Sequence, residues 1–245
     1  KEQLYEEFKH KLPLKLLKLP FDTGLAAGRN EIVKQCQTDY LLVLDDDETV
    51  GDDIGLLKLV LDEDPALGGV SAVLNEWGKK KCIAYNLKLI GDDVIKEYTN
   101  RDDKNNPELQ TKDGVRYKKF EFIPNSTLFR IECLKDLSWD NFYKIGKEHL
   151  DFYLSHKLLG KWEFAVALDV RVGHHPEESS SAYKDYRQGD RLAKSQNYFF
   201  NKFNLRQSLE GEKYIEPGGF INTYILFKRR LKILLKHGFN RESVK

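Results

Sequence analysis

Three consecutive carboxylates are the residues whose types and spacing point most directly to chemistry. Asp45, Asp46 and Asp47 directly follow a short apolar run, residues 40–44. Such a run predicts a fully buried strand, and three adjacent anions cannot be buried without a positive partner. A cation of the Mg²⁺ type takes one or two protein carboxylates and completes its shell with substrate phosphates. The alternative is a solvated acidic turn that caps the next helix.

A glycine-containing segment lies one predicted helix upstream of this acidic cluster. Asp22 is followed by Gly24 and Gly28, and then by Arg29 and Asn30. Two glycines before a helix N-terminus allow a tight backbone turn, which makes a natural anion site. The planar guanidinium of Arg29 suits a phosphate or the edge of a base. Such loops are common, and the position just before the acidic cluster is what favours nucleotide binding here.

Two groups late in the chain can act as a base or as a metal ligand. Glu148 and Asp151 are three residues apart and share a face of a predicted helix, so the pair can supply a general base. Acidic residues in a first helical turn also stabilise the helix dipole, which is the alternative role. His174 follows a predicted strand and is either a third metal ligand beside the acidic cluster or a hydrogen-bonded polar residue.

The tryptophans offer a surface on which a sugar ring could stack. Trp139, with its neighbour Asp140, and Trp162 are the candidates for contact with an acceptor sugar. Packing inside a core is the more frequent use of a tryptophan side chain. The sequence leaves both roles open for these residues.

Composition indicates an ordinary globular chain and excludes several classes of protein. Of 245 residues, 40% are apolar and 32% charged, and the net charge of +1 provides no whole-molecule basic field for nucleic acid. Cys36, Cys82 and Cys133 lack the spacing of a disulfide framework or a zinc site, which favours a reducing compartment. No apolar run has the length of a membrane span. Because the sequence contains no methionine, we expect a processed or incomplete chain.

The order of the predicted elements is that of an α/β protein. We expect a strand at residues 14–19, a helix at 25–37, a strand at 40–44 and a helix at 53–62, which is typical of a mostly parallel sheet. Further elements are expected as follows: strands at 68–74, 117–123, 126–131 and 164–172, a hairpin within 79–97, a mobile loop at 100–114, and helices at 147–159, 183–203 and 220–237. The last helix is apolar on one side and basic on the other. It either packs on the domain or lies on an anionic membrane surface.

Four blocks of the sequence resemble the GT-A glycosyltransferases of the family-two type. The blocks are residues 19–30, 38–47, 148–152 and 168–174, of which the first is the most specific. Within this family the chain is most similar to the ganglioside-type β-1,4-N-acetylgalactosaminyltransferases. The resemblance implies an α/β fold with a mixed, mostly parallel central sheet flanked by helices. It also implies a transferase domain at residues 1–210 and a basic, amphipathic helical extension at 211–245.

The resemblance implies an activity as well. It implies a metal-dependent, inverting transfer of a sugar such as GalNAc from a UDP-sugar to a hydroxyl of a glycan or glycolipid, with Mn²⁺ or Mg²⁺ as cofactor. A carbohydrate-binding protein of the same fold without turnover is the alternative. A nucleotidyltransferase with the same acidic turn is a third possibility, disfavoured by the late acidic helix and the strand that ends in histidine. Animal relatives are Golgi-lumenal, and the cysteine content fits a cytoplasmic enzyme as well.

The resemblance assigns the acidic cluster to the metal and the nucleotide. Asp47 would bind the metal, Asp45 would share it and lie nearer the ribose, and His174 would close the metal or diphosphate site. The other contacts with the nucleotide sugar would come from Asp22, Gly28, Arg29, Asn30 and Asp46. The metal would neutralise the departing diphosphate, which is Lewis-acid help to a leaving group.

The resemblance places the general base on the predicted helix at 147–159. Asp151 would match the acidic residue that deprotonates the acceptor hydroxyl. Family members often have Glu-Asp where this chain has Glu148 and His149, so Glu148 is the alternative base. Trp139 and Asp140 remain the candidates for acceptor contact.

The start of the chain departs from the family pattern. The family fold begins with a strand, a helix and a strand that hold the base of the nucleotide. The first strand predicted here, at 14–19, resembles the third strand of the family, so we expect the chain to begin inside the domain. The strands at 14–19 and 40–44 should then lie side by side, with an open groove along the strand at 40–44.

Overall fold

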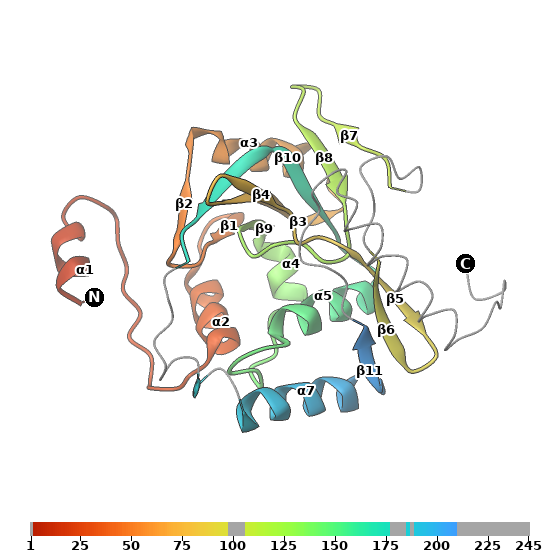
Figure 1. The fold of residues 1–245 in the computed structure, drawn as a ribbon. Helices are drawn as coiled ribbons and strands as arrows, with labels where there is room; N and C mark the ends of the chain where they lie inside the picture. Colours follow the sequence, from red (N-terminus) through yellow and green to blue (C-terminus); the bar gives the residue numbers. More distant parts are fainter. Residues whose placement is uncertain (1, 98–105, 177–184, 187–188, 210–245) are drawn as a thin grey trace.

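The computed structural model describes residues 2–97, 106–176, 185–186 and 189–209. Figure 1 shows a central sheet with one helix on one face, further helices on the opposite face, and a last helix beyond them. In chain order the helices are α1 (Glu2–Phe8), α2 (Leu25–Gln35), the 3₁₀ turn η1 (Asp52–Gly55), α3 (Leu56–Glu63), α4 (Ile131–Asp136), α5 (Glu148–Leu159) and α7 (Asp190–Lys202). The predicted helix at 220–237 and the extension at 211–245 lie outside the described residues.

The main sheet has the strand order β1-β9-β3-β10-β8-β7. In addition, β2 pairs with β10, and β4 pairs with β3. Its strands are β1 (Tyr40–Val43), β2 (Glu48–Val50), β3 (Leu67–Glu76), β4 (Lys79–Lys81), β7 (Leu109–Gln110), β8 (Arg116–Lys119), β9 (Thr127–Arg130) and β10 (Glu163–His174). A small sheet of order β11-β6-β5 contains β5 (Asn86–Ile90), β6 (Asp93–Glu97) and β11 (Gln207–Leu209). The mixed sheet flanked by helices is confirmed.

The mostly parallel character expected for the main sheet is wrong for the part of the chain described. β3 and β10 are parallel, and the pairs of β1 with β9, β9 with β3, and β10 with β8 are antiparallel. The reason is the path of the chain after β3. It leaves through the β5–β6 hairpin and returns as β8 and β9, which both enter the sheet in the reverse direction. β9 lies between β1 and β3, and β8 lies beside β10.

The direction of the strands collects their polar ends at one edge of the sheet. Because β9 is antiparallel to both β1 and β3, the strands β1, β3 and β10 all run the same way. The ends of these strands place the acidic cluster after β1, Glu76 at the end of β3 and His174 at the end of β10. Carboxyl ends of parallel strands are where open α/β sheets bind ligands. We call this side of the sheet the carboxyl edge.

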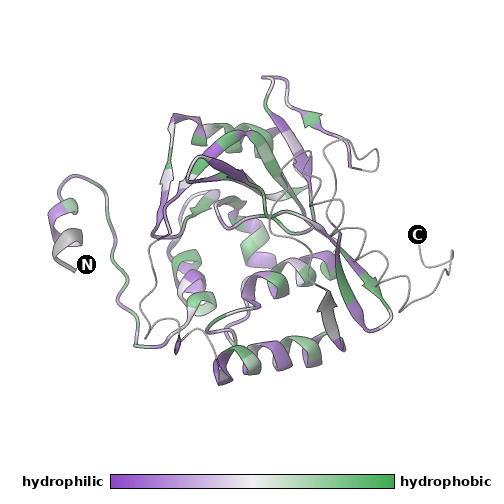
Figure 2. Cartoon of the chain, in the orientation of Figure 1, coloured by the Kyte–Doolittle hydropathy of each residue, from purple (hydrophilic) through white to green (hydrophobic). Residues whose placement is uncertain are grey.

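β1 is confirmed as a strand, but the prediction that it is fully buried is wrong. All four of its residues are partly exposed, because β9 flanks one side and no strand among the described residues pairs with the other. That open side was expected. The strand predicted beside it at 14–19 was wrong: this segment forms no ladder, and Leu14, Leu16 and Leu19 are exposed. Figure 2 shows the segment alternating between hydrophobic and hydrophilic residues.

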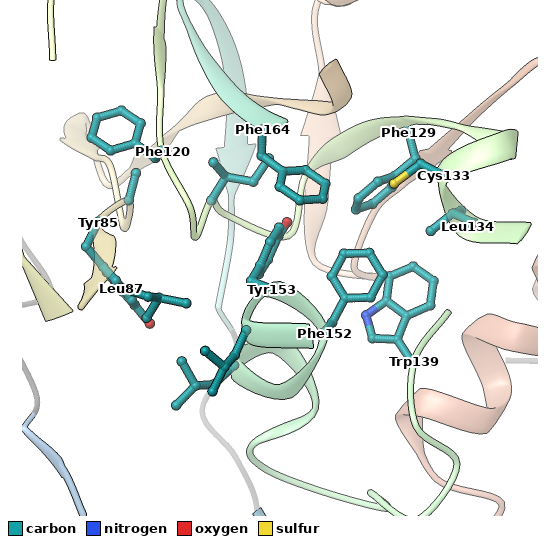
Figure 3. Close-up of a cluster of buried hydrophobic side chains, with 14 of the residues drawn as sticks. Tyr85, Leu87, Phe120, Phe129, Cys133, Leu134, Trp139, Phe152, Tyr153 and Phe164 are labelled. Atoms are coloured by element: carbon teal, nitrogen blue, oxygen red, sulfur yellow. The ribbon is translucent and has the colours of Figure 1, made fainter. Parts of the chain in front are cut away.

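The core consists of two apolar layers, one on each face of the sheet. Alternation along β3 turns Val70 and Ala72 toward α3, and Val73 toward α5. The layer on the α5 side is rich in aromatic rings (Figure 3). Trp139 stacks on Phe152 with ring centroids 4.9 Å apart, and such pairs contribute about 0.5–1.5 kcal/mol beyond their buried area. This layer holds α5 and the loop before it against the sheet.

Other sequence predictions differ from the structure at particular elements. The hairpin within 79–97 is β5 and β6, with β4 added to the edge of β3. The helix expected at 53–62 is preceded by β2 and the 3₁₀ turn, and α4 was not predicted because one and a half turns give no measurable periodicity. The helix expected at 183–203 is α7, which begins at Asp190. The loop expected at 100–114 falls partly outside the described residues and contains β7.

Candidate active site

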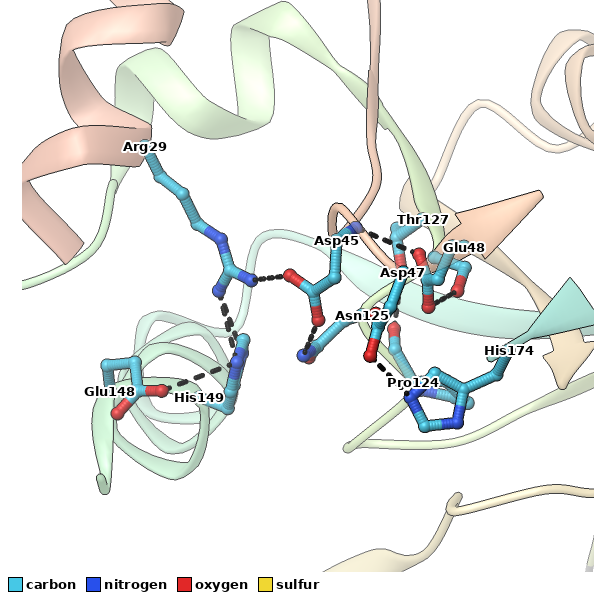
Figure 4. A network of polar contacts seen from close by, with 11 residues as sticks. Arg29, Asp45, Asp47, Glu48, Pro124, Asn125, Thr127, Glu148, His149 and His174 are labelled. Carbon is cyan, nitrogen blue, oxygen red and sulfur yellow. Dashed lines mark hydrogen bonds and ion pairs between the residues drawn. The ribbon is translucent and has the colours of Figure 1, made fainter. Parts of the chain in front are cut away.

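A polar network built on Arg29 lies at the carboxyl edge. α2 carries Arg29, whose side chain is only 5% exposed. Its Nη2 donates to Asp45 Oδ1 at 3.1 Å, and Asn125 Nδ2 donates to Asp45 Oδ2 at 3.2 Å (Figure 4). Its Nη1 lies 3.0 Å from His149 Nε2. The charge of Asp45 is therefore compensated by donors of the protein itself.

The N-terminus of α5 closes this network on its other side. Burial, reinforced by the positive charge of Arg29, holds the pKa of His149 well below its usual 6.5, so the neutral ring can accept a hydrogen bond from Arg29. Glu148 Oε1 lies 3.5 Å from the same His149 nitrogen, and Glu148 is buried. Glu148, His149, Arg29 and Asp45 thus form one row across the carboxyl edge (Figure 4).

The second half of the site is the pair of Asp47 and His174. His174 is opposite Glu76 in the parallel pairing of β10 with β3, and its Nδ1 lies 2.7 Å from Glu76 Oε2. The other ring nitrogen, Nε2, lies 3.4 Å from Asp47 Oδ2 (Figure 4). A carboxylate on one nitrogen orients a histidine ring so that the other nitrogen can serve as a ligand. Sequence reasoning missed Glu76, because only the strand register brings it to His174.

The acidic turn owes its shape to Glu48, which sequence reasoning also missed. Glu48 Oε2 accepts from the backbone N–H of Asp45 at 3.0 Å, and Oε1 accepts from Ser126 Oγ at 2.5 Å. Burial raises the pKa of Glu48 despite these donors. The two bonds fix the turn after β1 against the start of β9. They explain why Asp45 and Asp47 point to different partners.

The residues present fit a divalent cation only in part. Asp47 and His174 lie side by side, and carboxylate oxygen and imidazole nitrogen are both ligands that Mn²⁺ accepts. The predicted three-residue metal cluster is not assembled among the described residues, because Arg29 and Asn125 hold Asp45 away from it. A cation at Asp47 and His174 would therefore need oxygens of the substrate to complete its shell.

The predicted glycine loop is braced by protein contacts. Asp22 Oδ2 accepts from Lys144 Nζ at 2.9 Å, and Oδ1 accepts from Arg191 at 2.6 Å and from the Tyr186 hydroxyl. These donors hold the pKa of Asp22 far below its usual value. Gly24 is the glycine the turn requires: its φ is 90°, and a Cβ there would lie 2.6 Å from the Lys144 Cα. Gly28 lies inside α2, with ordinary space around it.

Asn30 and Trp139 are both held by contacts within the protein. Asn30 Nδ2 donates to the Trp139 carbonyl at 2.6 Å and to Asn141 Oδ1 at 2.7 Å. Asn30 Oδ1 accepts from the backbone N–H of Trp139 at 3.2 Å. Trp139 is 4% exposed, so its ring offers no surface to a sugar. Asp140 accepts from Tyr198 and Lys202 at 2.9 and 2.8 Å. These bonds hold the loop before α5 against α2 and α7.

Asp151 lies in a separate polar cluster. It is 2% exposed, accepts from the Tyr143 hydroxyl at 2.8 Å and from Lys202 Nζ at 2.9 Å, and has Ser155 Oγ at 3.4 Å. Burial raises the pKa of Asp151, partly opposed by Lys202 and Tyr143. We call Asp151 with Tyr143, Asp140 and Lys202 the α5–α7 clamp. Of the two candidate bases, Glu148 is the one in contact with the Arg29 network.

A cavity of about 650 Å³ lies elsewhere. Its lining includes Glu163 at the start of β10 and the side of α5 that carries Tyr153 and Lys157. His174 ends β10, so the cavity is at the opposite end of that strand. Its lining includes Trp162, one of the tryptophans predicted to contact a sugar, and none of the residues predicted for the metal, the nucleotide or the general base.

Comparison with known proteins bears on the fold and on the first third of the chain. Residues 1–81 match the sequence model of glycosyl transferase family 2. No curated protein matches the chain. The structure of S. aureus TarS 1–349 in complex with UDP-GlcNAc is similar, with a TM-score of 0.54 and 16% identity over 100% of this chain and 63% of that one. GalNAc-T7 with UDP, GalNAc and Mn²⁺ is similar with a TM-score of 0.55 and 14% identity, over 97% and 50%.

At these identities the likeness to solved structures concerns the fold. The chain spans less than two thirds of the length of either structure. The closer likeness to ganglioside-type enzymes stays a prediction. The fold of this chain is similar to that of these two structures, and its first 81 residues match the sequence model of glycosyl transferase family 2.

Proposed function

We propose that this chain transfers a sugar from a nucleotide sugar at the carboxyl edge. The observation that carries the proposal is the pair of Asp47 and His174, oriented by Glu76, beside the Arg29–Asp45 ion pair. A metal-binding pair and a buried guanidinium at one edge are what a nucleoside diphosphate needs, since both compensate phosphate charge. The match of residues 1–81 to the model of glycosyl transferase family 2 supports the proposed sugar transfer.

We assign the donor side of the site to the two acidic partners and Arg29. Asp47 and His174 would hold Mn²⁺ or Mg²⁺ together with the diphosphate of the donor, and the cation would supply Lewis-acid stabilisation of the leaving group. Asp45, held by Arg29 and Asn125, is positioned for a nucleotide hydroxyl rather than for the metal. Asp46 is exposed at the same turn and remains a candidate for donor contact.

We assign the general base to Glu148. A carboxylate there accepts the proton of the acceptor hydroxyl as its oxygen attacks the anomeric carbon and UDP departs, which inverts that centre in one displacement. Glu148 contacts His149 in the row that includes Arg29 and Asp45. Asp151 is the alternative, but its bonds to Tyr143 and Lys202 place it in the α5–α7 clamp.

The donor we propose is a UDP-N-acetylhexosamine, and the acceptor a glycan or glycolipid. The two similar structures are of proteins with UDP-GlcNAc and with UDP and GalNAc, which supports this class of donor. No helix among the described residues is long and apolar enough to cross a membrane. Contact with a membrane surface through residues 220–237 stays a proposal on the sequence alone.

Calorimetric titration of UDP with and without Mn²⁺ tests the donor site. We expect Mn²⁺ to tighten UDP binding in the wild type, and Asp47→Asn to lose that gain, at least about tenfold, the size of effect that metal-site substitutions produce. Asp52→Asn is the control, since Asp52 is an exposed acid at the start of the 3₁₀ turn that follows β2. Release of UDP from UDP-GlcNAc or UDP-GalNAc then measures turnover. Equal Mn²⁺ dependence in Asp47→Asn and wild type would overturn the metal assignment.

A further inference from the structure

The hairpin between β3 and β4 has an unusual residue at its tip. Glu76 pairs with Lys79, so the loop consists of two residues, Trp77 and Gly78, with φ of 52° and 76°. Two positive φ values define the type I′ turn, for which Asn-Gly is the preferred sequence. A bulky side chain in the left-handed region is a costly outlier. Residues held in such conformations cluster at functional sites.

Packing does not compensate for this backbone conformation. The side chain of Trp77 is 75% exposed, in contrast to the buried Trp139. A tryptophan contributes to stability by burying its large apolar ring, and Trp77 leaves that ring in solvent. An exposed ring on a strained turn indicates that the side chain of Trp77 serves to bind a ligand.

The hairpin lies beside the proposed transfer site. Glu76, the residue before Trp77, contacts His174, and His174 contacts Asp47. β2 pairs with the end of β10, with Glu48 opposite His174. The tip of the β3–β4 hairpin is therefore one residue beyond the carboxylate that orients the metal-binding pair (Figure 1 shows β4 and β2 at this side of the sheet). An indole here is within reach of a sugar that approaches the site.

The hairpin also carries a local excess of positive charge. Lys79 and Lys80 follow the tip and are exposed. Neither forms an ion pair with another residue of the part of the chain that the structure describes, whereas other lysines, such as Lys119, do. Cations next to an aromatic ring suit a ligand that combines a sugar ring with negative groups, because the ring stacks and the ammonium groups compensate charge.

We propose that the β3–β4 hairpin binds the acceptor, and that the acceptor is an anionic glycan. Trp77 stacks on a sugar ring of the acceptor, and Lys79 and Lys80 pair with its carboxylate or phosphate groups. This inference rests on the proposed function of the carboxyl edge. A membrane surface is the other ligand that tryptophan and lysine can recognise, but stable membrane contact needs more buried apolar surface than one ring provides.

The turn provides a variant that separates binding from folding. Trp77→Asn installs the Asn-Gly sequence that a type I′ turn prefers, so we expect its melting temperature to equal or exceed that of the wild type. Trp77→Phe keeps a ring and serves as the conservative variant. In the double variant Lys79→Glu/Lys80→Glu the charge is reversed. Lys112→Glu/Lys135→Glu, at exposed lysines of other elements, is the control with the same change in net charge.

Acrylamide quenching of tryptophan fluorescence measures binding without requiring activity. The probes are an oligogalacturonate for carboxylates, pentamannose 6-phosphate for phosphate, and maltohexaose as the neutral sugar. We expect an anionic oligosaccharide to shield the most exposed emission and to bind at least tenfold more tightly than maltohexaose. Trp77→Asn removes the reporting ring, so its affinity is measured by calorimetry, and we expect it to fall at least tenfold. The Lys79→Glu/Lys80→Glu variant should lose at least tenfold in affinity, and the control pair should bind as wild type.

The outcomes separate this inference from the proposed function. If Asp47→Asn loses Mn²⁺-dependent UDP binding while both hairpin variants bind the oligosaccharides as wild type, the hairpin is not the acceptor site and the proposed function stands. If the hairpin variants lose binding to phosphatidylserine vesicles but not to oligosaccharides, the hairpin is a membrane contact and the inference is wrong. If the wild type binds no UDP with Mn²⁺, both the proposed function and the acceptor assignment fail.

Discussion

The helix α5 carries two carboxylates three residues apart in opposite surroundings. Glu148 contacts His149 in the row that leads to Arg29 and Asp45. Asp151 is bonded to Tyr143 and Lys202 in the α5–α7 clamp. Helical spacing puts both residues on one face of α5. The elements packed on each side of α5 give the two carboxylates different partners. Two acids in one helical turn need not form a catalytic pair.

The two regions also differ in what their charges do. In the clamp, Lys202 from α7 bridges Asp140 and Asp151, so one ammonium group compensates part of the charge of the two carboxylates and joins α7 to α5. At the carboxyl edge, the one ionisable partner of the Asp47 side chain among the described residues is His174, which carries a charge only when protonated. The edge therefore has capacity for a cation and a phosphate, and the clamp does not.

The largest expected effect is on transfer, and it decides which acid is the base. Glu148→Gln should slow transfer about 10²–10⁴-fold, because an amide cannot accept the proton of the acceptor hydroxyl. Affinity for UDP and Mn²⁺ should stay unchanged. The rate of UDP release with acceptor, compared with the rate without it, gives the measurement.

Asp151→Asn is the matched variant, with the same change of carboxylate to amide three residues away. It should alter stability more than rate. If Asp151→Asn loses the rate and Glu148→Gln keeps it, the comparison above is reversed and Asp151 is the base. If both keep the rate, α5 is structural throughout.

The next effect concerns stability. Lys202→Met should lower the free energy of unfolding by about 3 kcal/mol, the lower end of the cost of leaving a buried charge without its partner, because Lys202 is partly exposed while Asp151 is 2% exposed. Urea denaturation measures it. Lys194→Met, at an exposed position of the same helix, should change stability little.

A second substitution in the clamp sharpens this test. In the Lys202→Met background, Asp151→Asn should restore part of the lost stability, because it removes the uncompensated charge. No restoration would mean that Lys202 acts through its contact with the Phe203 ring and not through its ion pair with Asp151.

The smallest expected effect is a slope in stability with pH. Burial lowers the pKa of His156 from 6.5 to about 4, so below pH 6.5 the unfolded chain takes up a proton that the folded chain does not. The free energy of unfolding should therefore fall as pH falls, by up to about 1.4 kcal/mol per pH unit between these values. His149 contributes with the same sign. Urea titrations at several pH values should show a shallower slope for His156→Gln, and an equal slope would contradict the assignment.

The sequence by itself determined several of the local elements and the acidic turn. The apolar run before Asp45 predicted a strand at residues 40–44, and β1 is Tyr40–Val43. Gly160 predicted the end of α5, where it caps the helix in a left-handed conformation. The predictions of a cation at the acidic cluster and of an anion at Arg29 came from residue type and spacing. These features depend on neighbours along the chain, so a single sequence contains the information.

Tertiary structure alone decided which residues meet. Glu76 reaches His174 because β3 and β10 pair in parallel at that register, and Asn125 reaches Asp45 because β9 pairs with β1. The same packing buries Trp139 against Phe152 and turns Asp151 toward Lys202. The role of Trp77 became visible only through its φ and its exposure. Strand pairing and burial depend on residues far apart in the chain, and the spacing of residues along one sequence carries no direct record of those contacts.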